Sequence, residues 1–285
     1  MKEKTGLFDI IIALVMGLIL VIILYPMLNI IAISFSGSAH VVQRSVTVFP
    51  RGFTLDAYRE IFSSPKIPHA YMNTFIYTGL GTVINILMTI LTAYPLSKSH
   101  LVGRKGFMTM IMLTMFFSGG MIPTYIVVRT LGMINTIWSL LLPNAIWTIE
   151  LLILMSFFRS LPSAIYESAV IDGASEYRIL WQLYVPLSKA SLASIGLFYF
   201  MGHWNSYVLP FLYLNDQSMY PIQLVLKDML LDETSSISNM VTTSAFTPTS
   251  LKNAVIFITM IPVMIIYPFV QRYFVQGVMI GSVKG

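Results

Sequence analysis

Few side chains in this sequence could take part in chemistry, and most of them lie inside long apolar runs. Glu150 stands within the run from Ile137 to Phe158 and is the one ionisable residue deep in such a run. A carboxylate is costly in an apolar environment, so it usually faces a cavity or a partner group. We consider two roles for Glu150: a hydrogen bond to the hydroxyl group of a passing solute, or a structural bond to a neighbouring helix.

A second group combines aromatic and polar side chains within one short stretch. His203, Trp204, Asn205 and Tyr207 follow one another in the segment GHWNSY. Aromatic rings present an apolar face, and Trp and Tyr also carry a polar group that needs a partner. This combination suits a sugar, whose ring faces stack and whose hydroxyls form hydrogen bonds. Ordinary helix packing with satisfied polar groups is the alternative.

The sequence offers no catalytic constellation. The phosphate-binding pattern Gly-x4-Gly-Lys-Ser/Thr is absent, so the chain is not expected to hydrolyse ATP. There is no cysteine, and the histidines and acids lack the spacing of metal ligands. No nucleophile elbow is present either. We therefore predict no catalytic residue, no metal site and no cofactor bound by this chain.

The composition indicates a membrane protein. Of the 285 residues, 56% are hydrophobic and only 10% are charged, whereas a soluble domain carries about 25% charged residues. The mean hydropathy is +0.78. The net charge of +5 comes from Lys and Arg that lie between apolar runs, where they fit a lipid surface rather than nucleic acid.

Six apolar windows are long enough to cross a bilayer, which takes about 20 residues each. This predicts an all-α polytopic protein with six transmembrane helices in a single membrane domain over residues 1–285. The first window is too long for a cleaved signal peptide, so we expect a retained helix. The predicted spans are Ile10 to Phe35, Tyr71 to Leu96, Phe107 to Val128, Ile137 to Phe158, Ser191 to Leu214 and Ala254 to Val270.

Basic residues in short loops predict the orientation. With six spans, ten of the 17 Lys and Arg residues fall on one side and seven on the other. The crowded short link between the second and third spans belongs to the first group. Both termini are therefore expected in the cytoplasm, in the cell (inner) membrane.

The segment 160–189, between the fourth and fifth spans, then lies on the cytoplasmic side. We expect a short helix from Ala164 to Ile171 with Ser163 as its N-cap, ended by the turn dipeptide Asp172-Gly173. A second helix should run from Ala174 to Tyr184 and end at Pro186. Its apolar face would carry Tyr177, Leu180, Trp181 and Tyr184. On physical grounds alone, an interfacial linker is the favoured reading.

This segment resembles the EAA signature of binding-protein-dependent ABC import permeases. The signature reads Glu-Ala-Ala, three residues, Gly, nine residues, then Ile-x-Leu-Pro. The chain has Glu167-Ser168-Ala169, Gly173 and Leu183-Tyr184-Val185-Pro186 at the same spacing, with Ser168, Leu183 and Val185 as departures. The stretches 116–143, 202–207 and 267–285 are similar to permeases for complex oligosaccharides, the aldouronate group, within the wider circle of maltose-permease relatives.

The resemblance implies a type I ABC importer permease with its core over residues 70–275. It implies several partners: a homologous second permease, two ATPase subunits that bind ATP and Mg, an extracytoplasmic solute-binding protein, membrane lipid and an oligosaccharide substrate. The EAA loop would be the contact with an ATPase. The residues that this assigns to ATPase coupling are Glu167, Ser168, Ala169, Asp172, Gly173, Ala174 and Arg178.

Three other functions remain open at this point. An ion-coupled secondary transporter would need ionisable residues in several spans and often an internal repeat, and only Glu150 fits. An ABC permease for a non-sugar solute would carry the same EAA loop. A membrane-bound enzyme would need a catalytic constellation.

Overall fold

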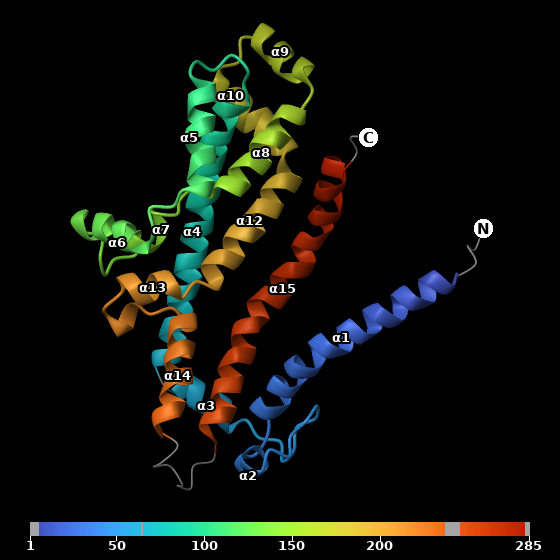
Figure 1. The fold of residues 1–285 in the computed structure, drawn as a ribbon, viewed down its shortest axis with the longest axis vertical. Coiled ribbons are helices and arrows are strands. Elements are labelled where there is room, and N and C mark those ends of the chain that lie inside the picture. Colours follow the sequence, from blue (N-terminus) through green and yellow to red (C-terminus); the bar gives the residue numbers. More distant parts are fainter. Residues whose placement is uncertain (1–5, 64, 237–245, 283–285) are drawn as a thin grey trace. The chain divides into compact units, whose positions relative to one another are not determined.

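The computed structural model describes residues 6–63, 65–236 and 246–282 and is helical in these ranges. Figure 1 shows the helices in chain order. They are α1 (Leu7–Ser34), α2 (Ser38–Val42), α3 (Asp56–Ser63), α4 (Lys66–Ser97), α5 (Arg104–Phe116), α6 (Met121–Thr130), α7 (Trp138–Leu141), α8 (Thr148–Ser160), α9 (Ser163–Ile171), α10 (Glu176–Ile179), a π-helical turn (Leu180–Tyr184), α11 (Val185–Leu187), α12 (Lys189–Trp204), α13 (Val208–Tyr213), a 3-10 turn (Gln217–Met219), α14 (Ile222–Ser236) and α15 (Pro248–Ser282).

The chain packs as two units. The first comprises residues 1–68 and 225–262, and the second comprises residues 69–224 and 263–285. In the first unit, the ring of Phe35 stacks on Phe53 and Tyr58 and meets Phe257 edge-on. The apolar side chains of α1 are exposed over most of the helix, as expected for a helix whose solvent is lipid.

The second unit contains a bundle of α4, α5, α8 and α12, with α9 and α10 closing one end (Figure 1). Its main core comes from α4, α8, α12 and the short helices between them, and includes Leu154, Phe158, Ile195 and Tyr199. A smaller core around Leu141 and Tyr213 joins α7 and α13. The bundle thus positions the segment that carries the EAA signature.

Three of the predicted spans are not continuous helices. The third breaks between α5 and α6, which meet at 117° around Ser118-Gly119-Gly120. Gly120 has φ +85°, a conformation that side chains with a Cβ rarely adopt. Among the residues that the structure describes, three helices are long and apolar enough to cross a membrane alone, and up to six spans result if each bent pair counts as one.

The fourth and fifth predicted spans are broken as well. Residues 142–147 separate α7 from α8, and residues 205–207 separate α12 from α13. Pro143 lacks the N–H that a continuous helix needs, which explains the first break. As a result, Glu150 lies in the first turn of α8 and not in the middle of a helix.

Candidate functional site

The turn after α9 is a Schellman motif, the hydrogen-bonded end that a helix forms when it stops at glycine. The N–H of Gly173 donates to the carbonyl of Val170 at 3.0 Å, and the N–H of Ala174 donates to the carbonyl of Ala169 at 2.9 Å. Gly173 has φ +73°, which favours glycine. The prediction that Asp172-Gly173 ends this helix is confirmed by this geometry.

The residues around this turn divide into a packed set and an exposed set. Ala169 is buried in the main core, and Ala174 packs against that core. A longer side chain at position 169 would have to displace its neighbours. Glu167, Ser168 and Asp172 are exposed. The turn is therefore a firmly seated projection with carboxylates on its outer side.

An apolar side chain stands at the tip of this projection. Ile171 is 85% exposed, and Val170 next to it is 48% exposed. Scattered exposed apolar residues are common on soluble surfaces, but here two of them adjoin two acids in one short turn. Such a surface suits insertion into an apolar groove with a basic rim.

The helix after the turn begins differently from our expectation. Ser175 is its N-cap, and its Oγ accepts from the N–H of Arg178 at 3.3 Å. The guanidinium of exposed Arg178 donates to Gln182 at 2.9 Å. The predicted N-cap role of Ser163 is wrong, because Pro162 holds that position before α9 without a side-chain hydrogen bond.

The helical run Glu176–Leu187 ends one residue after Pro186, where the chain bends by 81° into α12, so the predicted end is confirmed to within one residue. Within this run the π-helical turn Leu180–Tyr184 comes before Pro186, which is the second residue of the segment α11. At the start of a helical segment the missing N–H of proline costs little. Of the expected apolar face, Leu180 and Tyr184 are buried, while Tyr177 is 73% exposed.

A network of tyrosines joins this segment to the end of α4. The carboxylate of Glu176 accepts hydrogen bonds from Tyr94, on α4, and from Tyr166, on α9, the latter at 2.6 Å. The Nζ atom of Lys98 lies 3.5 Å from the ring centroid of Tyr166, 4.3 Å from that of Tyr184 and 4.6 Å from that of Tyr94. It also donates to the Tyr184 hydroxyl at 3.0 Å.

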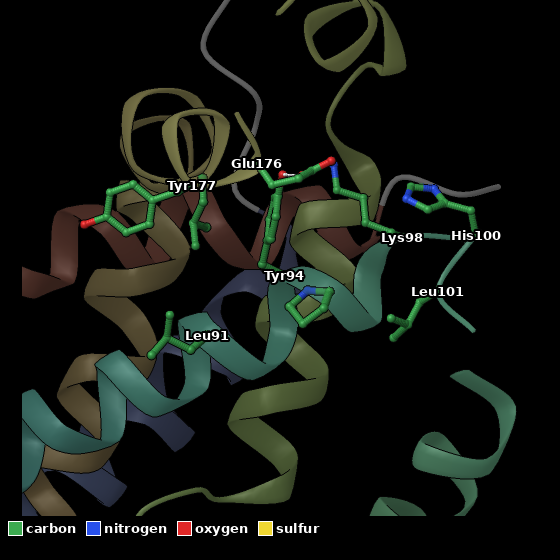
Figure 2. A pocket seen from close by; sticks show the side chains of 9 residues that line it. Leu91, Tyr94, Lys98, His100, Leu101, Glu176 and Tyr177 are labelled. Carbon is green, nitrogen blue, oxygen red and sulfur yellow. Dashed lines mark hydrogen bonds between the residues drawn. The ribbon is translucent and has the colours of Figure 1, made fainter. Parts of the chain in front are cut away.

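Tyr94, Lys98 and Glu176 border a cavity of about 420 Å³ at the end of the bundle. Figure 2 shows Tyr94 pointing towards Glu176, with Lys98 and then His100 on the side of Glu176 opposite to Tyr177. The other walls are apolar, formed by Leu91, Leu101 and their neighbours. This network was not predicted from the sequence, because Tyr94 and Glu176 are 82 positions apart. Within a short stretch of sequence, only the spacing of Tyr94 and Lys98, which are one helical turn apart, pointed to this network.

Burial, hydrogen bonds and neighbouring charges shift the pKa values of the groups in this network. Burial lowers the pKa of Lys98 from 10.5 to about 8, although the Glu176 carboxylate acts in the opposite direction. Burial tends to raise the pKa of Glu176, but the hydrogen bonds from Tyr166 and Tyr94 and the charge of Lys98 leave it lowered. The hydrogen bond to Glu176, followed by burial, raises the pKa of Tyr166 to about 12. At neutral pH the network therefore holds one cation and one anion.

The second group of candidate residues surrounds the break before α8. Asn85 of α4 is fully buried; its Nδ2 donates to the Asn144 carbonyl at 2.6 Å, and its Oδ1 lies 2.6 Å from His203 Nε2. Because this amide oxygen can only accept, His203 carries its proton on Nε2. A Cβ on Gly81 would lie 2.6 Å from the His203 ring, so α4 and α12 approach closely there. His203 thus ties α4 to α12.

Glu150 lies in the neighbourhood of this junction. It is only 9% exposed and belongs to the first turn of α8, which begins after Trp147. The N-terminus of a helix carries a partial positive charge that stabilises an acidic side chain in the first turn. The break in the predicted span therefore provides an electrostatic reason for a carboxylate at this depth.

The remaining members of the GHWNSY segment lie in different surroundings. Trp204 is buried, with its ring against Tyr71, Phe75 and Phe200. Asn205 is exposed and donates to the Met201 carbonyl at 2.9 Å, and Tyr207 is 47% exposed. The structure brings Glu150 and His203 near the Trp147 region and leaves Asn205 and Tyr207 at the surface. In the described ranges, no group of three His, Cys, Asp or Glu residues could hold a metal ion.

Comparisons with known proteins identify the chain. No protein-family model matches it. Protein LplC of Bacillus subtilis is 41% identical over 100% of this chain and 97% of its own length. The polygalacturonan/rhamnogalacturonan transport system permease protein YtcP of the same organism is 39% identical over 99% of this chain and 100% of its own length. This chain belongs to the permeases of binding-protein-dependent carbohydrate ABC importers.

A solved structure supports the same fold for this permease. A chain of a bacterial ABC transporter involved in the import of the acidic polysaccharide alginate superposes with a TM-score of 0.88 at 30% identity, covering 96% of this chain and 99% of that one. The predictions of an all-helical, multi-pass permease fold and of the family are confirmed. The permease is a multi-pass transport subunit of an ABC importer and is not itself an enzyme. The ion-coupled transporter, the non-sugar permease and the membrane enzyme are thereby set aside.

Proposed function

We propose that this permease forms, with a homologous second permease, the translocation path of an ATP-driven oligosaccharide importer. Two ATPase subunits bind ATP and Mg, and one of them receives the projection at the end of α9. The termini and the loop 160–189 lie in the cytoplasm. The observation that carries the proposal is the Schellman turn at Gly173, which presents Glu167, Ile171 and Asp172 outward while Ala169 is seated in the core.

The physical basis of coupling is the rigidity of this projection. Because Ala169 and Ala174 are packed into the bundle, a force on Ile171 moves the helices behind it rather than bending a free loop. ATP-driven closure of the ATPases would bring two such projections together and switch the path from inward-facing to outward-facing, which is alternating access through a bistable element. The acids at the turn are suited to pair with ATPase cations.

The relatives indicate the substrate class. One is a permease for polygalacturonan and rhamnogalacturonan by its name, and the transporter of known structure imports alginate. A further structure of the alginate transporter contains a periplasmic protein bound to an alginate pentasaccharide. We infer that an external binding protein delivers oligosaccharides to this permease, and that Glu150 contacts sugar hydroxyls. Oligogalacturonate, alginate oligosaccharides and neutral maltooligosaccharides are the first substrates to compare.

The absence of cysteine allows a direct test of ATPase docking. The complex is purified through a tag on this permease, and its chains are identified by mass spectrometry. Ile171→Cys is then paired with single cysteines along the ATPase surface and exposed to an oxidant. Crosslinks to the ATPase are expected.

Phe62→Cys is the matched control, because Phe62 is also an exposed apolar residue, at 71%, but lies in the predicted external segment. It should give no ATPase crosslink. If Ile171→Cys fails to crosslink in an assembled complex, or crosslinks only to an external protein, the proposed coupling role is refuted.

A further inference from the structure

The network behind the projection connects four separate pieces of the chain. Tyr94 belongs to α4 and Lys98 follows its end, Tyr166 belongs to α9, and Glu176 is the first residue of α10. Tyr184 closes the π-helical turn. Glu176 accepts from two of the tyrosines, and Lys98 lies over three of their rings. The network thus joins both short helices of the EAA segment to one long helix of the bundle.

The polar contacts of the network restrain the rotation of the EAA helices, which the surrounding apolar contacts do not. Burial of apolar surface is non-directional, so Ala169 and Ile179 hold the EAA helices against the core without fixing their rotation. A hydrogen bond weakens steeply when its angle departs from linear, and hydrogen bonds to a charged group are about twice as strong as neutral ones. Turning α9 relative to α4 would break the Tyr166 or the Tyr94 bond to Glu176.

The cation is held through rings and not by a direct ion pair. Within the part of the chain that the structure describes, no ion pair within 4.0 Å joins Lys98 to Glu176. An ammonium over the face of an aromatic ring is attracted by the negative charge of that face, most strongly where water is excluded. Lys98 therefore holds three tyrosines in place at once, although these come from three different elements.

We propose that Lys98, Glu176 and the three tyrosines form a latch that passes movement of the ATPase-docked helix α9 to α4. This rests on the proposed function, because it assumes that α9 receives the force. Without the latch the EAA helices would stay folded and docked, but they would shift against α4 when the ATPases close. ATP would then be hydrolysed with less sugar moved per molecule. Lys98, Glu176, Tyr94, Tyr166 and Tyr184 are positioning residues, since none of them need touch sugar or nucleotide.

Tyr166→Phe is the decisive variant. It keeps the ring under Lys98 and removes only the hydroxyl that donates to Glu176 at 2.6 Å. Tyr177→Phe is the matched control, because Tyr177 also lines the cavity but is 73% exposed and outside the network. The complete transporter with its binding protein is reconstituted in proteoliposomes, and sugar imported per ATP hydrolysed is measured. We expect a fall of about threefold to tenfold for Tyr166→Phe, the range for the loss of one typical hydrogen bond at an exposed site, and no change for Tyr177→Phe.

The ratio of sugar imported to ATP hydrolysed separates a latch from a merely structural contact. A structural contact would reduce the amount of assembled complex, and import and hydrolysis would fall together at a constant ratio; that result overturns the proposal. Glu176→Gln, which removes the anion, should lower the ratio at least as much. If it does not assemble, Tyr166→Phe decides alone. A normal ratio with intact Ile171→Cys crosslinking refutes the latch only, whereas failure of the crosslink refutes the docking itself.

Discussion

Substitution of Gly173 tests the Schellman turn on which the coupling proposal stands. Gly173 has φ +73°, and a Cβ built on it meets nothing within 4 Å, so any penalty of alanine is conformational and not steric. The left-handed conformation costs an ordinary residue about 1–2 kcal/mol. Alanine also restricts the unfolded chain, which offsets about 0.4–1 kcal/mol. A net destabilisation of the turn by about 1 kcal/mol is expected for Gly173→Ala.

The other substitutions at this position should follow a defined order. Asn tolerates the left-handed region, so Gly173→Asn is expected to retain most coupling. Proline cannot adopt φ +73° and also loses the hydrogen bond to Val170, so Gly173→Pro should abolish coupling while the spans still insert. Sugar imported per ATP hydrolysed in proteoliposomes should fall in the order Gly, Asn, Ala, Pro.

Gly132 is a matched control within the same chain. It has φ +69° and open space around it, and it ends α6 with the same pair of hydrogen bonds, Gly132 to Arg129 and Met133 to Val128. Gly132→Ala therefore carries the same backbone penalty outside the EAA segment. We expect unchanged import per ATP. Equal uncoupling by Gly132→Ala and Gly173→Ala, or normal import by Gly173→Pro, would show that the turn has no special role.

Three further outcomes follow from the same structure. Gly202→Ala should lower the melting temperature of the complex by overpacking worth about 1–3 kcal/mol, because a Cβ there would overlap the Trp147 ring; an unchanged melting temperature would contradict the close packing. Glu150→Gln should raise the half-saturating sugar concentration several-fold with assembly intact, and unaltered uptake kinetics would assign Glu150 a structural role. Raising the pH from about 7 to about 9 should lower import per ATP, since Lys98, with a pKa of about 8, loses the charge that its rings bind. Between pH about 8 and about 10.5 the unfolded chain binds the Lys98 proton more fully than the folded chain does, so the Lys98 contribution to the free energy of unfolding rises with pH. If the melting temperature instead falls together with import per ATP, the loss of import does not arise from the Lys98 charge.

The end of α9 was predictable because its signals are local. The Asp172-Gly173 pair sets the helix end through the conformational freedom of glycine, and the following hydrogen bonds involve residues within five positions. The second helix was predicted less well within its bounds than at its end near Pro186. A π-helical turn precedes Pro186 inside the helical run, and no short-range pattern indicated it.

The spans were found by hydropathy but their breaks were not. Hydropathy averages over a window as long as a span, so a Pro143 or a Gly119-Gly120 pair hardly changes it. The latch and the Asn85–His203 bond depend on residues 82 and 118 positions apart. Such pairs form only once the bundle brings α4 beside α10 and α12, so they could not be predicted from one sequence.

The turn and the latch both hold α9 to the start of α10, which makes a sharp prediction for their combination. The Gly173 turn sets how α9 meets α10, and the Tyr166 bond holds α9 to Glu176, so a failure of either already lets α9 shift. If both lie on one route, Gly173→Ala together with Tyr166→Phe should reduce import per ATP by less than the product of the two single effects, because residues that act as a unit are non-additive. Independent routes would instead give the full product. The wild type, the two single variants and the double variant are prepared in parallel, and the import of each is divided by its ATPase rate and its amount of assembled complex. The comparison of these four values decides between one route and two.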